Sequence, residues 1–186
     1  RMDADDEGRV LALELTLAAD DDVTFEQNVL LSRVAGGEAD MAEFLEKFGH
    51  RCVGEMELME PRWREEPDYL GRLIESLRDN GIDAMEVQRR NSERRDLAVK
   101  VLPEKLRSWG GSSFLEEALE LADTARRLLP YRERGKYYLM MGYELIRSAI
   151  LELSRRWDIG SDVFFLKQSE LQQFEESRVD LLAVIE

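Results

Sequence analysis

The only histidine and the only cysteine of the chain lie two residues apart, at His50 and Cys52. A zinc site usually has three or four nitrogen and sulfur ligands, which this pair cannot supply. A cysteine–histidine catalytic dyad is also disfavoured, because side chains at positions i and i+2 of a helix point apart. We therefore expect neither a metal site nor a nucleophilic dyad at this pair.

Three carboxylates follow the pair, at Glu55, Glu57 and Glu60. If this segment is extended, Glu55 and Glu57 project to the same face. Two such carboxylates suit a magnesium ion, which prefers oxygen ligands, or act as an acid and a base. Chance clustering is the favoured alternative, because the chain has 40 acidic side chains.

A third group is the run RERGK, with Arg132, Glu133 and Lys136. On a helix, residues four apart share a face, about 6 Å from each other. If a helix begins here, its amino-terminal end adds partial positive charge, and two cations form a phosphate clamp with Glu133 orienting Lys136. The alternative is a solvated surface pattern of little energetic value.

The stretch WGGSSFLEE at residues 109–117 resembles a phosphate-binding loop but lacks the Gly-Lys-Ser/Thr ending of a P-loop. Ser113 and Glu116 have the spacing of a capping box. We therefore expect a helix start at this position rather than a nucleotide site.

The composition of the chain indicates which partners and which cellular location to expect. The net charge is −14, from 40 acidic and 26 basic side chains, which disfavours nucleic acid and anionic membrane as partners. A single cysteine and the lack of any long apolar run favour a cytoplasmic protein. The first residue is Arg rather than Met, so we expect either a single helical domain spanning residues 1–186 or a fragment of a longer protein.

Apolar spacing predicts an all-α fold, a multi-helix bundle of about seven or eight helices. One short strand-like segment is expected near residues 162–166. Thr24 is expected to cap the second helix, and Pro130 to open the longest one. The expected helices cover residues 9–19, 23–34, 40–48, 66–80, 83 to about 102, 113–129 and 131–158, followed by SELQQF.

Three blocks in this order resemble the phosphoenolpyruvate-utilising enzyme family, whose members include phosphoenolpyruvate synthase-like proteins and rifampicin phosphotransferases. The resemblance covers about residues 40–175. The blocks are Phe48-Gly49-His50-Arg51 with Gly54-Glu55, Pro61-Arg62-Trp63 and Glu66-Pro67; Arg132-Glu133 with Lys136 and Tyr137-Tyr138; and the exit segment DIGSDVFFLKQSEL at residues 158–171.

The resemblance implies a parent enzyme in which an ATP-grasp domain, using ATP and magnesium, loads a phosphoryl group onto a histidine of a swivelling domain. That domain then carries it to a small-molecule acceptor, pyruvate or a rifamycin-like compound. This chain is similar to the helical middle domain, which frames the acceptor. It has no Gly-rich ATP loop, and His50 lacks the sequence context of the phosphocarrier histidine. We therefore expect the chain to bind no cofactor itself.

The resemblance also assigns roles to residues. It implies that substrate or phosphoryl binding involves Arg51, Glu55, Arg132, Glu133 and Lys136. A structural turn between helices falls to Gly49, His50, Gly54, Pro61, Arg62 and Trp63. The family usually has Gly-Pro where this chain has Cys52-Val53, and cysteine lacks the backbone freedom of glycine.

A second function class stays open beside the first. The chain also fits a non-catalytic helical module that binds protein partners. Coding sequence for ATP-grasp and phosphohistidine domains on either side would favour the phosphotransferase.

Overall fold

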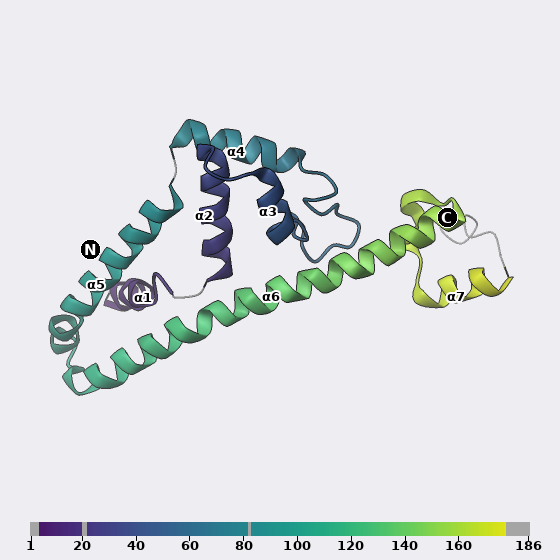
Figure 1. The fold of residues 1–186 in the computed structure, drawn as a ribbon. Coiled ribbons are helices and arrows are strands. Elements are labelled where there is room, and N and C mark those ends of the chain that lie inside the picture. The colour runs from purple at the N-terminus through teal and green to yellow at the C-terminus, as the bar shows by residue number, and fades with distance from the viewer. Residues whose placement is uncertain (1–3, 20–21, 82, 178–186) are drawn as a thin grey trace.

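The computed structural model describes residues 4–19, 22–81 and 83–177, and within these ranges every regular element is a helix (Figure 1). The predicted all-α fold is thereby confirmed. The elements are α1 (Ala4–Leu15), α2 (Val23–Gly36), α3 (Met41–Phe48), α4 (Asp68–Asn80), α5 (Ala84–Ser108), the 3-10 helix η1 (Ser112–Phe114), α6 (Leu115–Trp157), the 3-10 helix η2 (Gly160–Phe165) and α7 (Gln168–Ser177).

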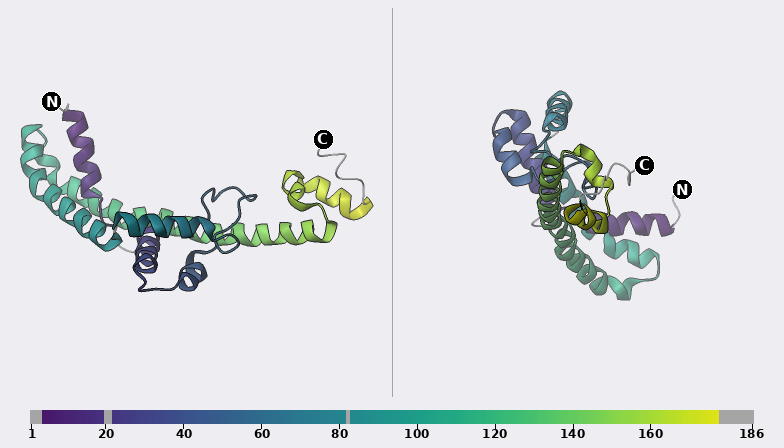
Figure 2. Two further views of the ribbon diagram at one scale, coloured as in Figure 1. Left: turned by 90° about the horizontal axis from the view of Figure 1, so that it is seen from above. Right: turned by 90° about the vertical axis from the view of Figure 1, so that its right-hand side faces the viewer.

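Helix α6 is the long axis of the molecule, with 43 residues. The group α2, α3 and α4 lies against its middle (Figure 1). Helices α1 and α5 pack together near its amino-terminal end, and η2 packs on its carboxyl-terminal end, where α7 also lies (Figure 2). Side chains from three separate groups of elements therefore meet one helix.

The larger core lies between α2, α3 and α4. Phe44, Phe48 and Leu70 are fully buried there, and Trp63 from the loop before α4 joins them. The ring centroids of Phe44 and Trp63 are 5.9 Å apart. Because Phe44 and Phe48 are four residues apart, α3 turns both rings to the same side. Through Trp63, this cluster anchors the loop between α3 and α4 to the core.

The smaller core joins α1 to α5 through Leu11, Leu15, Ala98 and Leu102. Leucines alternate along this first segment as in a strand, although a helix is expected over residues 9–19. The helix is confirmed, because Leu11 and Leu15, four residues apart, are buried while Leu13 is 68% exposed. The helix ends at Leu15 rather than at residue 19.

Aspartates cap three helices. Asp22, Asp40 and Asp83 each accept a hydrogen bond from the backbone N–H two residues later, at 2.8 to 3.0 Å. The expected cap of α2 by Thr24 is therefore wrong, since Asp22 performs it. Gly37 and Gly81 end α2 and α4 with φ of 78° and 59°, a left-handed conformation that glycine adopts without strain.

Two expectations about the start of α6 are wrong. Pro130 lies inside α6 and does not open a new helix, so two expected helices form one. A proline removes a backbone donor and costs about 3 kcal/mol in a helix interior, yet α6 continues through Pro130, which is buried. The Ser113 cap is also absent, since η1 and Phe114 lead into α6 without a side-chain capping bond.

The expected strand-like segment at residues 162–166 is the 3-10 helix η2 instead. Gly160 turns the chain with φ of 57°, and its carbonyl accepts a 2.6 Å hydrogen bond from the hydroxyl of Ser154. Only Val163 of this apolar run is buried. A lone strand with no neighbour to pair with gains no ladder hydrogen bonds, so a helical turn is preferred.

Within the described ranges, no helix has both the length and the apolar content needed to cross a lipid bilayer. The expected single domain over residues 1–186 stays a prediction, and its two ends, at 1–3 and 178–186, lie outside the described residues.

We predict that Phe44→Ala lowers the free energy of unfolding by about 3–5 kcal/mol, because it removes a fully buried ring and leaves a cavity. The measurement is urea denaturation followed by circular dichroism. The matched control is Phe114→Ala, whose ring is 58% exposed. Equal losses in the two variants would contradict the assigned core.

Candidate functional site

The loop at residues 49–67 joins α3 to α4 and folds back on itself. The N–H of Trp63 donates to the carbonyl of Arg51 at 2.8 Å, and the N–H of Arg64 donates to the carbonyl of Gly49 at 3.0 Å. A Cβ atom at Gly49 would lie 2.9 Å from the Cβ of Arg64, closer than real Cβ contacts come. Glycine at position 49 therefore permits the two ends of the loop to approach each other closely.

Arg62 is the centre of this loop and is fully buried. Its guanidinium donates to the Sγ of Cys52 at 2.7 Å and to the carbonyls of Glu55 and Glu57 at 3.1 and 3.4 Å. Burial raises the pKa of the Cys52 thiol, although the charge of Arg62 opposes this. The thiol is thus a neutral hydrogen-bond acceptor that helps to shape the turn, and no nucleophilic role is indicated.

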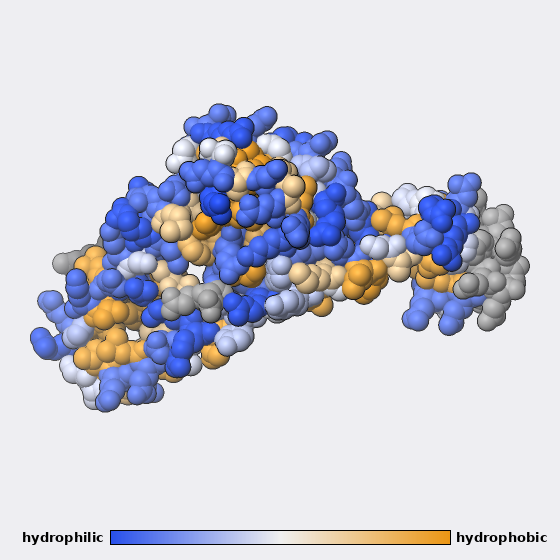
Figure 3. Space-filling model, viewed as in Figure 1, coloured by the Kyte–Doolittle hydropathy of each residue, from blue (hydrophilic) through white to orange (hydrophobic). Residues whose placement is uncertain are grey.

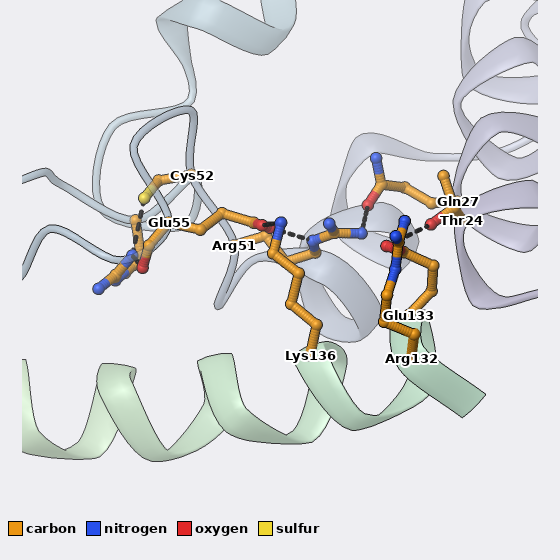
Figure 4. A network of polar contacts seen from close by, with 9 residues as sticks. Thr24, Gln27, Arg51, Cys52, Glu55, Arg132, Glu133 and Lys136 are labelled. Carbon is orange, nitrogen blue, oxygen red and sulfur yellow. Dashed lines mark hydrogen bonds and ion pairs between the residues drawn. The ribbon is translucent and has the colours of Figure 1, made fainter. Parts of the chain in front are cut away.

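The buried carboxylate of Glu55 joins this loop to α6 (Figure 4). One oxygen pairs with Nε of Arg51 and the other with Nζ of Lys136. The guanidinium of Arg51 also donates to Oε1 of Gln27 on α2 at 2.6 Å. Residues predicted from two distant blocks of sequence, Arg51, Glu55 and Lys136, therefore form one network.

The ionisation of Glu55 is decided by opposing effects. Burial raises the pKa of the carboxyl, while hydrogen bonds and charges from Arg51 and Lys136 lower it. The net result is a pKa below its ordinary value, so the group is an anion at neutral pH. A buried anion between two cations is a rigid element that positions both.

Arg132 and Glu133 lie one turn before Lys136 on α6, in contact with α2. The Arg132 guanidinium is 81% exposed and pairs with Glu133 at 2.7 Å. The hydroxyl of Thr24 donates to the second oxygen of Glu133 at 3.4 Å. Glu133 thus pairs with Arg132 and Thr24 and does not orient Lys136 as expected.

The expected contribution of a helix amino terminus to anion binding by Arg132 and Lys136 is wrong as well. Because α6 begins at Leu115, Arg132 and Lys136 lie in its interior, where no free backbone N–H groups point outward. Any attraction for an anion at this position comes from the two side chains alone.

His50 is buried against Tyr137, with ring centroids 4.6 Å apart and planes at 87°. The hydroxyl of Tyr137 in turn donates to the carbonyl of Lys47 at 2.9 Å. Burial and the charges of Arg51 and Arg64 lower the pKa of His50 to about 4. The imidazole is thus neutral and enclosed between α3 and α6, and its Nε2 has no hydrogen-bond partner among the described residues. Its structural role stays a prediction.

The magnesium or acid–base pair considered for Glu55 and Glu57 requires an extended segment, but residues 53–56 form a turn. Glu57 is exposed and accepts a 3.0 Å hydrogen bond from the N–H of Met59, away from the network of Glu55. Among the described residues, no group of three His, Cys, Asp or Glu side chains lies close enough to hold a metal ion.

Two arginines that fix the loop were missed by sequence reasoning. Arg147 on α6 is buried, pairs with Glu65 at 2.8 Å and donates to the carbonyls of Leu58 and Met59. Arg64 pairs with Glu144 of α6 at 3.0 Å. A signal for Arg147 existed, because it follows the buried Met140 by seven residues and so lies on the same face of the helix.

A hollow of about 450 Å³ lies between α2, α4 and α5, next to this site. Thr24, the donor to Glu133, is part of its wall. The remaining wall combines polar side chains (Asp22, Asn28, Ser32, Gln88, Asn91) with apolar ones (Phe25, Leu31, Leu73, Leu77, Ala84, Val87). The hollow therefore offers both hydrogen-bonding groups and apolar surface to a small molecule.

Comparison with known proteins gives a consistent set of matches. The family described as the rifampicin phosphotransferase fourth domain matches residues 13–133. The rifampicin phosphotransferase of Streptomyces sviceus is 29% identical over 163 residues, which cover 80% of this chain and 18% of that protein. The rifampicin phosphotransferase of Bacillus cereus is 26% identical over 141 residues, covering 70% of this chain and 16% of that protein. The chain spans less than two thirds of the length of either relative.

The low pKa of His50 predicts a specific pH dependence. Above pH 6.5 the imidazole is neutral in both the folded and the unfolded chain; between pH 6.5 and about 4 only the unfolded chain takes up the proton. His50 therefore removes stability as the pH falls through this window, on the order of 3 kcal/mol. Urea denaturation at several pH values should show a shallower loss for His50→Gln, and parallel curves would contradict the buried neutral imidazole.

We predict that Glu55→Gln lowers the free energy of unfolding by about 3 kcal/mol, because Arg51 is left buried without its anion. Glu86→Gln is the control, since Glu86 also pairs with two cations, Arg89 and Arg90, but on the solvent side of α5. Thermal and urea unfolding of both variants provide the comparison. A control variant as destabilised as Glu55→Gln would show that burial of the network is unimportant.

Proposed function

Since the chain belongs to the rifampicin phosphotransferase fourth-domain family, we propose that it is the helical domain that frames the phosphoryl acceptor in an ATP-dependent phosphotransferase. The observation that carries this proposal is the network of Glu55 with Arg51 and Lys136. It fixes a lysine on α6, one turn after an exposed arginine whose partner Glu133 bonds to Thr24, a residue in the wall of the hollow.

The charged side chains of this network have different roles, which follow from their burial. Arg51 and Glu55 are buried and hold Lys136, whose side chain remains 38% exposed. Arg132 extends into solvent four residues before it. Two cationic side chains whose Cβ atoms are about 6 Å apart on one helix can both reach the equatorial oxygens of a transferring phosphoryl group, whose transfer depends mainly on positioning and charge stabilisation.

An acceptor hydroxyl must lose its proton as its oxygen bonds to phosphorus and the bond from phosphorus to the carrier breaks. Glu133 is the carboxylate next to Arg132 and the hollow, so we assign it the role of accepting that proton. His50 is not the carrier in this proposal, because it is buried and neutral. The carrier histidine belongs to a phosphohistidine domain of the parent chain.

The described residues offer neither a metal cluster nor a Gly-rich phosphate loop, so they do not fit ATP and magnesium. We place both on an ATP-grasp domain of the parent chain. A cytoplasmic location goes with this chemistry, since ATP is available there, and also stays a proposal.

We propose a rifamycin-type acceptor rather than pyruvate. The relatives are named for rifampicin, and a large hydroxylated molecule matches the mixed wall of the hollow beside Thr24. Pyruvate is small and charged and would fill little of the 450 Å³. The alternative class, a non-catalytic module for binding proteins, predicts no affinity for either molecule.

Kinetics of the full-length protein test this proposal. We expect Lys136→Ala to lower kcat for ATP-dependent phosphorylation of rifampicin on the order of 10²–10³-fold, with little change in the Kd of rifampicin, because the lysine acts on developing charge. Lys100→Ala, at an exposed position of α5, is the matched control and should retain full turnover.

Two results would contradict the proposal. One is near-normal turnover of Lys136→Ala. The other is ATP turnover by the 186-residue chain alone, which should bind rifampicin, measured by quenching of tryptophan fluorescence, without consuming ATP. Tight binding of pyruvate with none of rifampicin would keep the domain assignment and change the acceptor.

A further inference from the structure

Helix α6 carries an apolar stripe on a surface that none of the described elements covers. Its members recur at alternating intervals of three and four residues, the spacing of a helix–helix contact. The four large side chains are each more than half exposed, and Leu145 reaches 72%. The stripe consists of Leu128, Tyr131, Gly135, Tyr138, Gly142, Leu145 and Ala149.

The stripe faces away from the rest of the molecule. Met140 and Arg147 mark the buried side of α6, and Tyr138 and Leu145 each precede one of them by two residues. Two residues correspond to a rotation of about 200° around a helix, so the stripe lies almost opposite the domain. Apolar side chains are visible on the stretch of α6 between the α2–α4 group and α7 (Figure 3). A long exposed apolar surface of this kind marks an interaction site.

Large and small residues alternate along the stripe. A Cβ atom at Gly135 or Gly142 would meet nothing within 4 Å, so open space lies over each glycine. Tyr131, Tyr138 and Leu145 project beside these gaps. The stripe therefore has both knobs and holes, which is the requirement for packing against a copy of itself.

We propose that two copies of this chain associate through an antiparallel pair of α6 helices. The stripe has two kinds of position, one at residues 128, 135, 142 and 149 and the other at residues 131, 138 and 145. In an antiparallel pair, each position of the first kind lies opposite a position of the second kind on the partner helix. One register brings every hole to a knob: Gly135 opposite Tyr138 of the second copy, Gly142 opposite Tyr131 of the second copy, and Leu128 opposite Leu145 of the second copy. The two-fold symmetry repeats each contact, as in other closed dimers.

The charges beside the stripe agree with this register. Near the ends of the pair, Glu117 lies opposite Arg156 of the second copy, and Glu120 opposite Arg155 of the second copy. In the centre, Arg134 faces Met141 of the second copy. Like charges do not oppose one another at these positions. In a parallel pair, each arginine of α6 would instead lie beside the same arginine of the second copy. The inference does not depend on the proposed phosphotransferase activity.

Sedimentation equilibrium of the 186-residue chain tests the association. We expect a particle of twice the chain mass of 21.6 kDa at micromolar concentration. Leu145→Glu should weaken dimerisation by at least about 100-fold in Kd, since two buried apolar contacts per dimer are replaced by charge. The control is Leu97→Glu, at a position 60% exposed on α5 and off the stripe, which should stay dimeric.

Disulfide trapping tests the register. Leu128→Cys mixed with Leu145→Cys should form a crosslinked dimer, while each variant alone should not, because equal positions lie about 25 Å apart in an antiparallel pair. A chain that remains monomeric, a dimer unaffected by Leu145→Glu, or crosslinking of each variant with itself would overturn the proposal. In the monomeric case, the stripe would be left for another domain of the parent protein.

Discussion

The salt-bridged carboxylate of Glu55 is the interaction on which the arrangement of the site depends. It lies in a loop of irregular backbone, yet it holds Arg51 beside α2 and Lys136 on α6 at once. A buried charge costs several kcal/mol unless it is paired and hydrogen-bonded. Because both oxygens have cationic partners, this carboxylate can keep its charge inside the protein, and its pair with Lys136 ties the loop to α6.

The surrounding arginines extend the same principle. Inside the loop, Arg62 donates hydrogen bonds to backbone carbonyls, while Arg64 and Arg147 attach the loop to α6. An acidic chain with a net charge of −14 thereby places several of its cations inside a single region. In the proposed function this concentration of positive charge serves two purposes, since it builds the turn and leaves Lys136 and Arg132 available for a phosphoryl group.

The sequence predicted the features that depend on local chemistry. Glycine stops at Gly37 and Gly81 and the helical period of α3 were visible in the residues themselves. The role of Pro130 was not, because its tolerance inside α6 depends on burial by distant elements. Residue types and spacing singled out Glu55 and Lys136, and the resemblance added Arg51, but only the fold shows that Arg51 and Lys136 share the carboxylate of Glu55. Spacing alone wrongly paired Glu133 with Lys136.

The state of Glu55 connects fold and proposed chemistry, and it can be observed directly. The measurement is the pH titration of the Glu55 carboxyl carbon by ¹³C NMR, in the native chain and in Lys136→Ala. A shared anion predicts a pKa below the ordinary value of 4.5 in the native chain and a higher one in the variant. A pKa above 4.5 in the native chain, or one that is unchanged when Lys136 is removed, would contradict the shared carboxylate.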